Sequence, residues 1–185
     1  MLKKSSRDLI GYGKKGKKIS WPNNAKLALQ IVLNYEEGGE NSVLNGDQFS
    51  ETFLAEIIGA KAIKGRHISM ESIYEYGSKV GFWRLDRLFK EKKIPVTIFG
   101  VGLALDQNPE VCEAIKKGDY EVAAHGYRWI DYQNIKKSVE KKHMHQAIKT
   151  IKNIFGSRPL GWYTGRCSPN TRDLVFDDGG FLYDS

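Results

Sequence analysis

The sequence has little that would cross-link it or place it in a membrane. Its two cysteines, Cys112 and Cys167, are too few for the disulfide framework of a small secreted domain. No apolar run approaches the length of a membrane span, and the lysines of the first residues are not followed by the apolar segment of a secretory signal. These absences predict a cytoplasmic protein without a membrane span.

The body of the chain also lacks a strong net charge. The formal charge is +7, but the first eighteen residues carry +6 of it. We interpret residues 1–20 as a basic, solvated N-terminal arm and residues 21–185 as one domain, since 41% hydrophobic content suits a single ordinary core. A near-neutral body gives no reason to expect a nucleic-acid partner.

Apolar segments alternate with helical patterns along the domain. Buried strands are expected at 27–33, 96–101, 121–124, 160–163 and 181–183, and helices from 82, at 109–117, at about 134–155 and at 170–176. Between 39 and 80 the clear elements are a short helix near 50–58 and a capping box, Ser72-Ile73-Tyr74-Glu75. Strands that alternate with helices predict parallel βα units.

The number of strands is small for a closed barrel. Such a barrel needs about eight parallel strands, and five are visible here. We therefore expect an α/β fold of the incomplete (β/α) barrel type, with about five parallel strands. Its last strand would be an unprotected edge unless a second copy, or a complementing C-terminal fragment, covers it.

Ionisable residues follow several of the expected strands. Glu36 and Glu37 follow the first and His125 the third, and the carboxyl ends of parallel strands share one rim. Adjacent carboxylates can divide the work of activating a water, so Glu36, Glu37 and His125 are the catalytic candidates. Two questions stay open. One of the glutamates could pair with an arginine instead of facing the site. His125 could be a general acid, a ligand or a buried histidine with its hydrogen bonds satisfied.

A further group on or near this rim could bind substrate. Guanidinium and hydroxyl groups suit a developing oxyanion, and tryptophans can wall a small flat molecule. The predicted substrate-binding residues are Tyr76, Arg128, Trp129, Trp162, Tyr163, Arg166 and Asp184.

The order of Tyr35-Glu36-Glu37-Gly38, then His125, then Gly161-Trp162-Tyr163 resembles the polysaccharide deacetylase (NodB homology) family. The resemblance implies a distorted βα barrel with Glu36 at the position of the catalytic base and Glu37 at that of a metal-binding acid. His125 matches the first histidine of a ligand pair, and Trp129 stands at the second. Within the family, the chain looks like the metal-independent allantoinase branch of urate catabolism, over these blocks: Arg7–Gly13, Leu33–Glu40, Met70–Ser72, Tyr74–Gly77, His125–Tyr132 and Gly161–Arg166.

This resemblance implies hydrolysis of the cyclic amide of allantoin to allantoate. Glu37 and His125 would supply at most two of the three protein ligands that a catalytic zinc needs, so neither a metal nor another cofactor is expected. Tyr163 and Gly165 depart from the arginine and proline of the deacetylases, and a later histidine motif of the family is absent before Ser185.

Two other functions remain open. One is a metal-dependent N-deacetylase acting on a cell-wall or chitin-like polymer of N-acetylated sugars, and the other is an inactive truncated remnant of such an enzyme. Two attractive motifs are set aside: Phe176-Asp177-Asp178-Gly179 follows a helix and so lies at the opposite end of the barrel, and His143-Met144-His145 fits a solvated helix face.

Overall fold

The computed structural model describes residues 11–185 and divides the chain into two units, 1–30 and 31–185. In the first unit the described element is a short 3₁₀ turn, η1 (Pro22–Asn24). Residues 1–10, which hold part of the predicted basic arm and most of the Arg7–Gly13 block, lie outside the described residues. The boundary of that arm at residue 20 stays a prediction.

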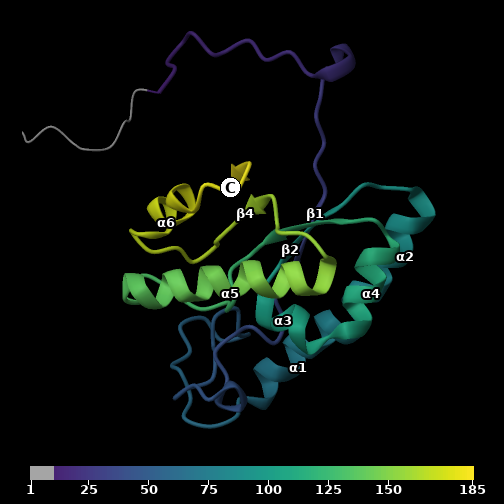
Figure 1. Ribbon diagram of the computed structural model, residues 1–185. Coiled ribbons are helices and arrows are strands. Elements are labelled where there is room, and N and C mark those ends of the chain that lie inside the picture. The colour runs from purple at the N-terminus through teal and green to yellow at the C-terminus, as the bar shows by residue number, and fades with distance from the viewer. Residues whose placement is uncertain (1–10) are drawn as a thin grey trace, which may run out of the picture. The chain divides into compact units, whose positions relative to one another are not determined.

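The second unit is built on one parallel sheet (Figure 1). Its strands are β1 (Val32–Tyr35), β2 (Thr97–Gly100), β3 (Glu121–Ala124), β4 (Gly161–Trp162) and β5 (Tyr183–Asp184). They lie side by side in chain order, so each βα unit adds the next strand along. The predicted five parallel strands are confirmed. Within the described residues, β1 and β5 each have one neighbouring strand.

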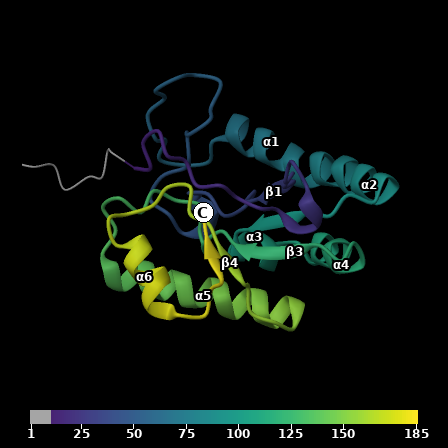
Figure 2. The same ribbon diagram turned by 90° about the horizontal axis from the view of Figure 1, so that it is seen from above.

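The helices are α1 (Ile68–Tyr76), α2 (Phe82–Lys92), α3 (Gly102–Gln107), α4 (Pro109–Lys117), α5 (Lys137–Phe155) and α6 (Thr171–Asp178), with a π-turn η3 (Gly77–Gly81) between α1 and α2 and a 3₁₀ turn η2 (Val43–Asn45). Figure 2 shows α1 and α2 on the β1 side of the sheet, and α5 and α6 on the β4 side. Local signals set several ends: Asn108 caps α4 by accepting from the N–H of Val111, and α5 ends at Gly156 with φ +84°.

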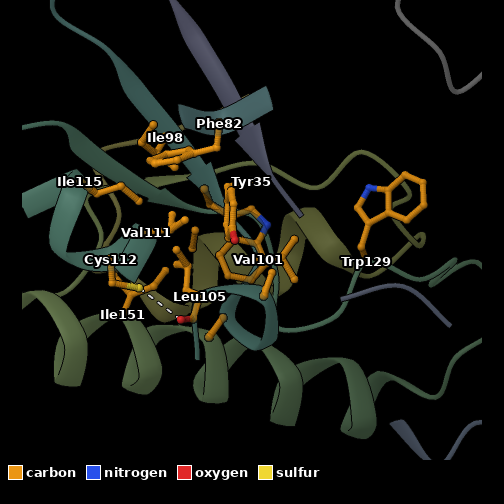
Figure 3. Packing of buried hydrophobic residues seen from close by; sticks show 14 of the residues in the cluster. Tyr35, Phe82, Ile98, Val101, Leu105, Val111, Cys112, Ile115, Trp129 and Ile151 are labelled. Carbon is orange, nitrogen blue, oxygen red and sulfur yellow. Dashed lines mark hydrogen bonds between the residues drawn. The ribbon is translucent and has the colours of Figure 1, made fainter. Parts of the chain in front are cut away.

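The core lies between the sheet and its helices (Figure 3). Its largest fully buried side chains come from β1, β2 and the helices that follow, and they are Tyr35, Ile98, Leu105, Ile115 and Ile151. Tyr35 packs edge-on against Phe82 and accepts a hydrogen bond from Asn108 Nδ2 at 2.9 Å. The last residue of β1 is thereby fixed directly before the two glutamates.

Three predictions about elements are wrong. Residues 50–58 form turns, with Leu54 at φ +65°, in place of a helix. Ser72 is inside α1, because His67 caps this helix by accepting from the N–H of Met70. The first strand begins at Val32, although the apolar run begins at Leu27, since pairing with β2 is confined to Val32–Tyr35. Among the described helices, none is long and apolar enough to span a bilayer, and the cytoplasmic location stays a prediction.

Candidate active site

Glu36 and His125 meet at the carboxyl end of the sheet. Glu36 follows β1 and His125 follows β3, on either side of β2, and Glu36 Oε2 lies 2.9 Å from His125 Nε2. His125 is 4% exposed, whereas the Glu36 side chain retains 23% of its surface. The pair therefore presents a partly accessible carboxylate backed by a buried imidazole.

The second ring nitrogen of His125 fixes where the protons lie. Nδ1 is 3.0 Å from the carbonyl oxygen of Tyr163, which can only accept a hydrogen bond, so Nδ1 carries a proton and donates it. One further proton must then lie between Nε2 and Glu36 Oε2. The pair holds it either as imidazolium and carboxylate or as imidazole and carboxylic acid, which is the arrangement of a group that exchanges protons with a substrate.

The ring of His125 is held in place by stacking. Tyr163 stacks on it with ring centroids 4.8 Å apart, and Phe99 of β2 stacks on Tyr163 at 4.8 Å and lies 6.4 Å from His125. Tyr163 therefore positions His125 twice, through its backbone carbonyl and through its ring. Its role in binding substrate stays a prediction.

Glu37 faces away from this pair. Its Oε2 accepts a hydrogen bond from the Glu36 N–H at 3.3 Å, and its carboxylate packs against Gly77 in the π-turn, where a β-carbon would overlap it. Burial raises the pKa of Glu37, although backbone N–H groups oppose that rise, and the charges of Glu36 and Glu40 add to it. Glu37 is thus accommodated by a glycine, and among residues 11–185 no arginine forms an ion pair with it, unlike in the alternative left open above.

A cavity of about 380 Å³ lies on the Glu37 side. Its lining includes the acidic side chains of Glu37, Glu40, Glu71 and Glu75, and neither Glu36 nor His125 is among its described lining residues. Glu40 Oε2 accepts from the N–H of Gly38 at 2.6 Å, and Gly38 has φ +100°. This tight turn separates the space beside Glu37 from the Glu36–His125 pair.

Arg128 is engaged with the protein itself. Its Nε donates to the carbonyl of Gly39 at 3.1 Å, and one terminal nitrogen donates to the carbonyl of Glu40 at 2.9 Å and to Asp47 at 2.5 Å. The guanidinium therefore fixes the loop after Glu37. Its role in binding substrate stays a prediction.

Trp129 and Arg166 belong to one stack of side chains. The guanidinium of Arg166 lies 5.1 Å from the ring centroids of Trp129 and Phe53, and its nitrogen donates to Glu51 Oε2 at 3.0 Å. Tyr74 meets Trp129 edge-on and donates a hydrogen bond to the carbonyl of Phe53. The stack ties the 39–66 segment to α1 and to the end of β4.

Glu51 is the residue of this stack that sequence reasoning missed. It is 8% exposed, and its carboxylate also accepts from the N–H of Phe53 and from Asn41. Burial alone would raise the pKa of Glu51, but these donors together with Arg166 outweigh burial and hold that pKa below its ordinary value. No local pattern marks Glu51, because its partners come from three separate segments.

The other predicted binding residues, Trp162, Tyr76 and Asp184, contact residues other than His125. Trp162 is buried, packs on Phe181 and donates from Nε1 to Thr164 Oγ1 at 2.6 Å. Tyr76 is 56% exposed at the end of α1, and Asp184 is exposed in β5. No contact brings these three to the Glu36–His125 pair within the described residues.

The donor atoms present do not fit a catalytic metal. A zinc with an open position needs three protein ligands, and Glu36 and His125 are two. Glu37 is turned to Gly77, and Trp129 occupies the place implied for a second histidine. Across residues 11–185, no three histidine, cysteine, aspartate or glutamate side chains are close enough to hold one ion.

Comparisons with known proteins agree with this fold. A family model described as polysaccharide deacetylase matches residues 65–179. Among solved structures, PuuE allantoinase is 51% identical with a TM-score of 0.92, and the match covers 98% of this chain and 60% of that one. A Pseudomonas aeruginosa PAO1 structure described as a polysaccharide deacetylase is 53% identical with a TM-score of 0.93, covering 98% and 61%.

Curated relatives point the same way. A Schizosaccharomyces pombe protein named as a polysaccharide deacetylase is 43% identical over 176 residues, which are 92% of this chain and 55% of that protein. The peptidoglycan deacetylase of Helicobacter pylori is 29% identical over 111 residues, or 59% of this chain and 38% of that one. The chain spans about half or less of the curated relatives it matches and about three fifths of the two similar structures.

Proposed function

The chain belongs to the polysaccharide deacetylase family, and on that premise we propose that it is a hydrolase of non-peptide carbon–nitrogen bonds that opens a cyclic amide of the allantoin type without a metal. The observation that carries this proposal is the Glu36–His125 pair, a partly exposed carboxylate 2.9 Å from a buried imidazole. Similarity to PuuE allantoinase over 98% of the chain supports the choice of substrate class.

The reaction needs a base, a proton donor and a stabilised oxyanion. With the shared proton on His125 Nε2, the Glu36 carboxylate takes a proton from a water whose oxygen forms a bond to the amide carbon, giving a tetrahedral intermediate. As the intermediate collapses, the ring carbon–nitrogen bond breaks and the proton held between Glu36 and His125 passes to the leaving nitrogen. The hydrogen bond from His125 Nδ1 to the Tyr163 carbonyl fixes the ring, so that Nε2 faces Glu36 and can hold the proton until it is transferred.

Residues near this pair are proposed to stabilise the oxyanion and to hold the plane of the substrate. The Tyr163 ring lies against His125, so its hydroxyl and nearby backbone N–H groups are the proposed donors. Trp129 and Arg166 provide a flat, cationic wall, although Arg166 is already paired with Glu51. The proposed binding set therefore centres on Tyr163, Trp129 and Arg166, with Tyr76, Arg128, Trp162 and Asp184 as outer candidates.

A second candidate is N-deacetylation of an N-acetylated carbohydrate or peptidoglycan. It is favoured by the curated relatives, which carry deacetylase names at 43% and 29% identity. Both reactions cleave an amide, and the Glu36–His125 pair suits either. The donor set favours the first candidate, because a metal-dependent deacetylase would need ligands that Glu37, turned to Gly77, and Trp129 do not supply.

We further propose that the active form covers the free edge of β5. Phe176 and Leu182 beside this edge are 83% and 78% exposed, and β5 pairs with β4 alone among the described strands. A second copy or a complementing fragment would bury them. An uncovered chain that is stable but inactive is the third candidate, a remnant of such an enzyme.

The decisive experiment assays two products. The purified chain is incubated with allantoin and with N-acetylated chitin or peptidoglycan oligomers, and allantoate and acetate are measured with and without a chelator. The proposal expects allantoate formation that the chelator leaves unchanged. Acetate release abolished by the chelator supports the deacetylase instead, and loss of allantoate formation on chelation contradicts the metal-free reaction.

A further inference from the structure

The outer face of α5 carries a row of positive charge. Lys137, Lys141, His145, Lys149 and Lys152 follow one another at spacings of four, four, four and three residues, which places them on one line along the helix. All five side chains are exposed. At about 1.5 Å per residue the row is roughly 22 Å long, with a side chain about every 6 Å.

This row is not neutralised by the protein. Glu140, the one acid of α5, is 6% exposed and turned inward, where it accepts hydrogen bonds from Ser168 and Thr171. Among the ion pairs of the described residues, none involves a lysine of α5. Some lysines elsewhere in the described residues are paired, as Lys90 is with Asp86 and Lys116 with Glu113.

Charges of one sign at i and i+4 destabilise a helix, and here the repulsion recurs along its length. An extended anion lying on the row would remove this repulsion and release its own counterions. Figure 1 shows α5 as a long helix lying outside the sheet, with α6 beside its N-terminal part, where Glu140 accepts from Thr171.

The residues beside the row indicate the kind of anion. Gln146 and Asn153 flank it, and their amides can bond to sugar hydroxyls. Phe155 is at the C-terminal end of α5 and is partly buried in the core, so the row has a single ring, that of His145, and lacks the successive rings on which neighbouring bases of a single strand stack. Val139 is exposed but off the line, so no apolar side chain of the row would enter a bilayer.

We propose that the α5 row, Lys137, Lys141, His145, Lys149 and Lys152, is a docking surface for a linear acidic polysaccharide. The row binds the polymer through its charges and holds it on the outside of the barrel, apart from the Glu36–His125 pair. This surface does not require hydrolysis, so its test is independent of the proposed function.

The test measures binding of the full chain to labelled heparin across a range of salt concentrations. The variant K137Q/K141Q/K149Q/K152Q is compared with K79Q/K92Q/K116Q/K117Q, which removes the same charge from other exposed positions. The row variant is expected to bind at least about tenfold more weakly and with a flatter salt dependence, because fewer counterions are released. The control variant is expected to change affinity less than about threefold.

Several outcomes would overturn the proposal: equal weakening in both variants, absence of heparin binding near physiological salt, or tighter binding to RNA or to phosphatidylserine vesicles than to heparin. A neutral N-acetylglucosamine polymer should not bind the row. Any affinity of the chain for this polymer should therefore be the same in the row variant as in the unchanged chain. If circular dichroism shows that the fourfold variant is unfolded, two other measurements replace it. One is heparin binding by K141Q/K149Q, and the other is protection of the Lys141 and Lys149 amines of the unchanged chain from acetylation when heparin is bound.

Discussion

Glu36 and His125 are 89 positions apart in the sequence, and their side chains meet with Oε2 2.9 Å from Nε2. The strand that separates theirs, β2, supplies Phe99 to support the ring of Tyr163 against His125. Three neighbouring strands thus contribute one carboxylate, one imidazole and one supporting ring, which makes the pair the first place to test.

Replacing either member of the pair should abolish most activity. We expect Glu36→Gln and His125→Asn each to lower kcat by about 10²–10⁴-fold, because each removes the shared proton path. The double variant should be little worse than either single one, since the two act as a unit. The exposed Glu91→Gln is the control, and the rate of allantoate formation is the measurement. A larger loss from Glu37→Gln than from Glu36→Gln would contradict the assignment of the base.

Glu37→Gln should stabilise the fold near neutral pH. Burial raises the pKa of Glu37, so its native carboxylate is disfavoured and its contribution to stability is lost as pH rises through that raised value. We expect a higher melting temperature at pH 7, by roughly 2–4 °C for a change of about 1 kcal/mol, and no difference below pH 4. Thermal unfolding at both pH values checks this against Glu91→Gln. A gain that persists in acid would show another cause.

Gly77→Ala should destabilise the protein through Glu37. A β-carbon at Gly77 overlaps the Glu37 carboxylate, whereas one at Gly81 in the same π-turn has its nearest neighbour, the carbonyl of Tyr76, at 3.7 Å. We expect Gly77→Ala to cost about 1–3 kcal/mol in urea unfolding and Gly81→Ala to be neutral or stabilising. Shortening the neighbour in Glu37→Ala/Gly77→Ala should recover part of the loss. Equal effects at the two glycines would contradict this packing.

Arg166→Gln should leave Glu51 buried without its charged partner. We expect a loss of about 1–3 kcal/mol at pH 7, where Glu51 is ionised, and a smaller loss as pH falls and this carboxyl takes up a proton. Urea unfolding of Arg166→Gln, Glu51→Gln and the double variant gives the coupling, which should exceed about 1 kcal/mol. Arg66→Gln, at the exposed pair with Glu71, is the matched control. Equal losses at the two arginines would refute the buried pair.

Local signals predicted the fold where they were strong. Helix α4 and strand β3 have the predicted bounds, since Pro109 and Gly118 mark the ends of one and a short apolar run the other. The start of β1 was misjudged because the apolar run extends beyond the residues that pair with β2. The helix predicted near 50–58 does not form, because segment 39–66 is organised by contacts to Arg128 and Arg166, far away in sequence.

The site was predicted in outline and missed in detail. Because the carboxyl ends of parallel strands lie on one rim, the sequence predicted that Glu36 and His125 lie close together. Sequence left open which glutamate faces His125, and the answer depends on Gly77, a residue forty positions later. The partners of Arg128 were equally hidden, since two of them are backbone carbonyls that no side-chain pattern reveals.

The side chain of Glu36 contacts His125, and that of Glu37 packs against Gly77. Selection can therefore act on these two adjacent positions for different properties. A change at position 37 alters how the loop packs on the π-turn, and a change at position 36 alters the contact with His125. A lineage can therefore exchange one acid and retain the other, which gives evolution a way to adjust stability while the chemistry is preserved.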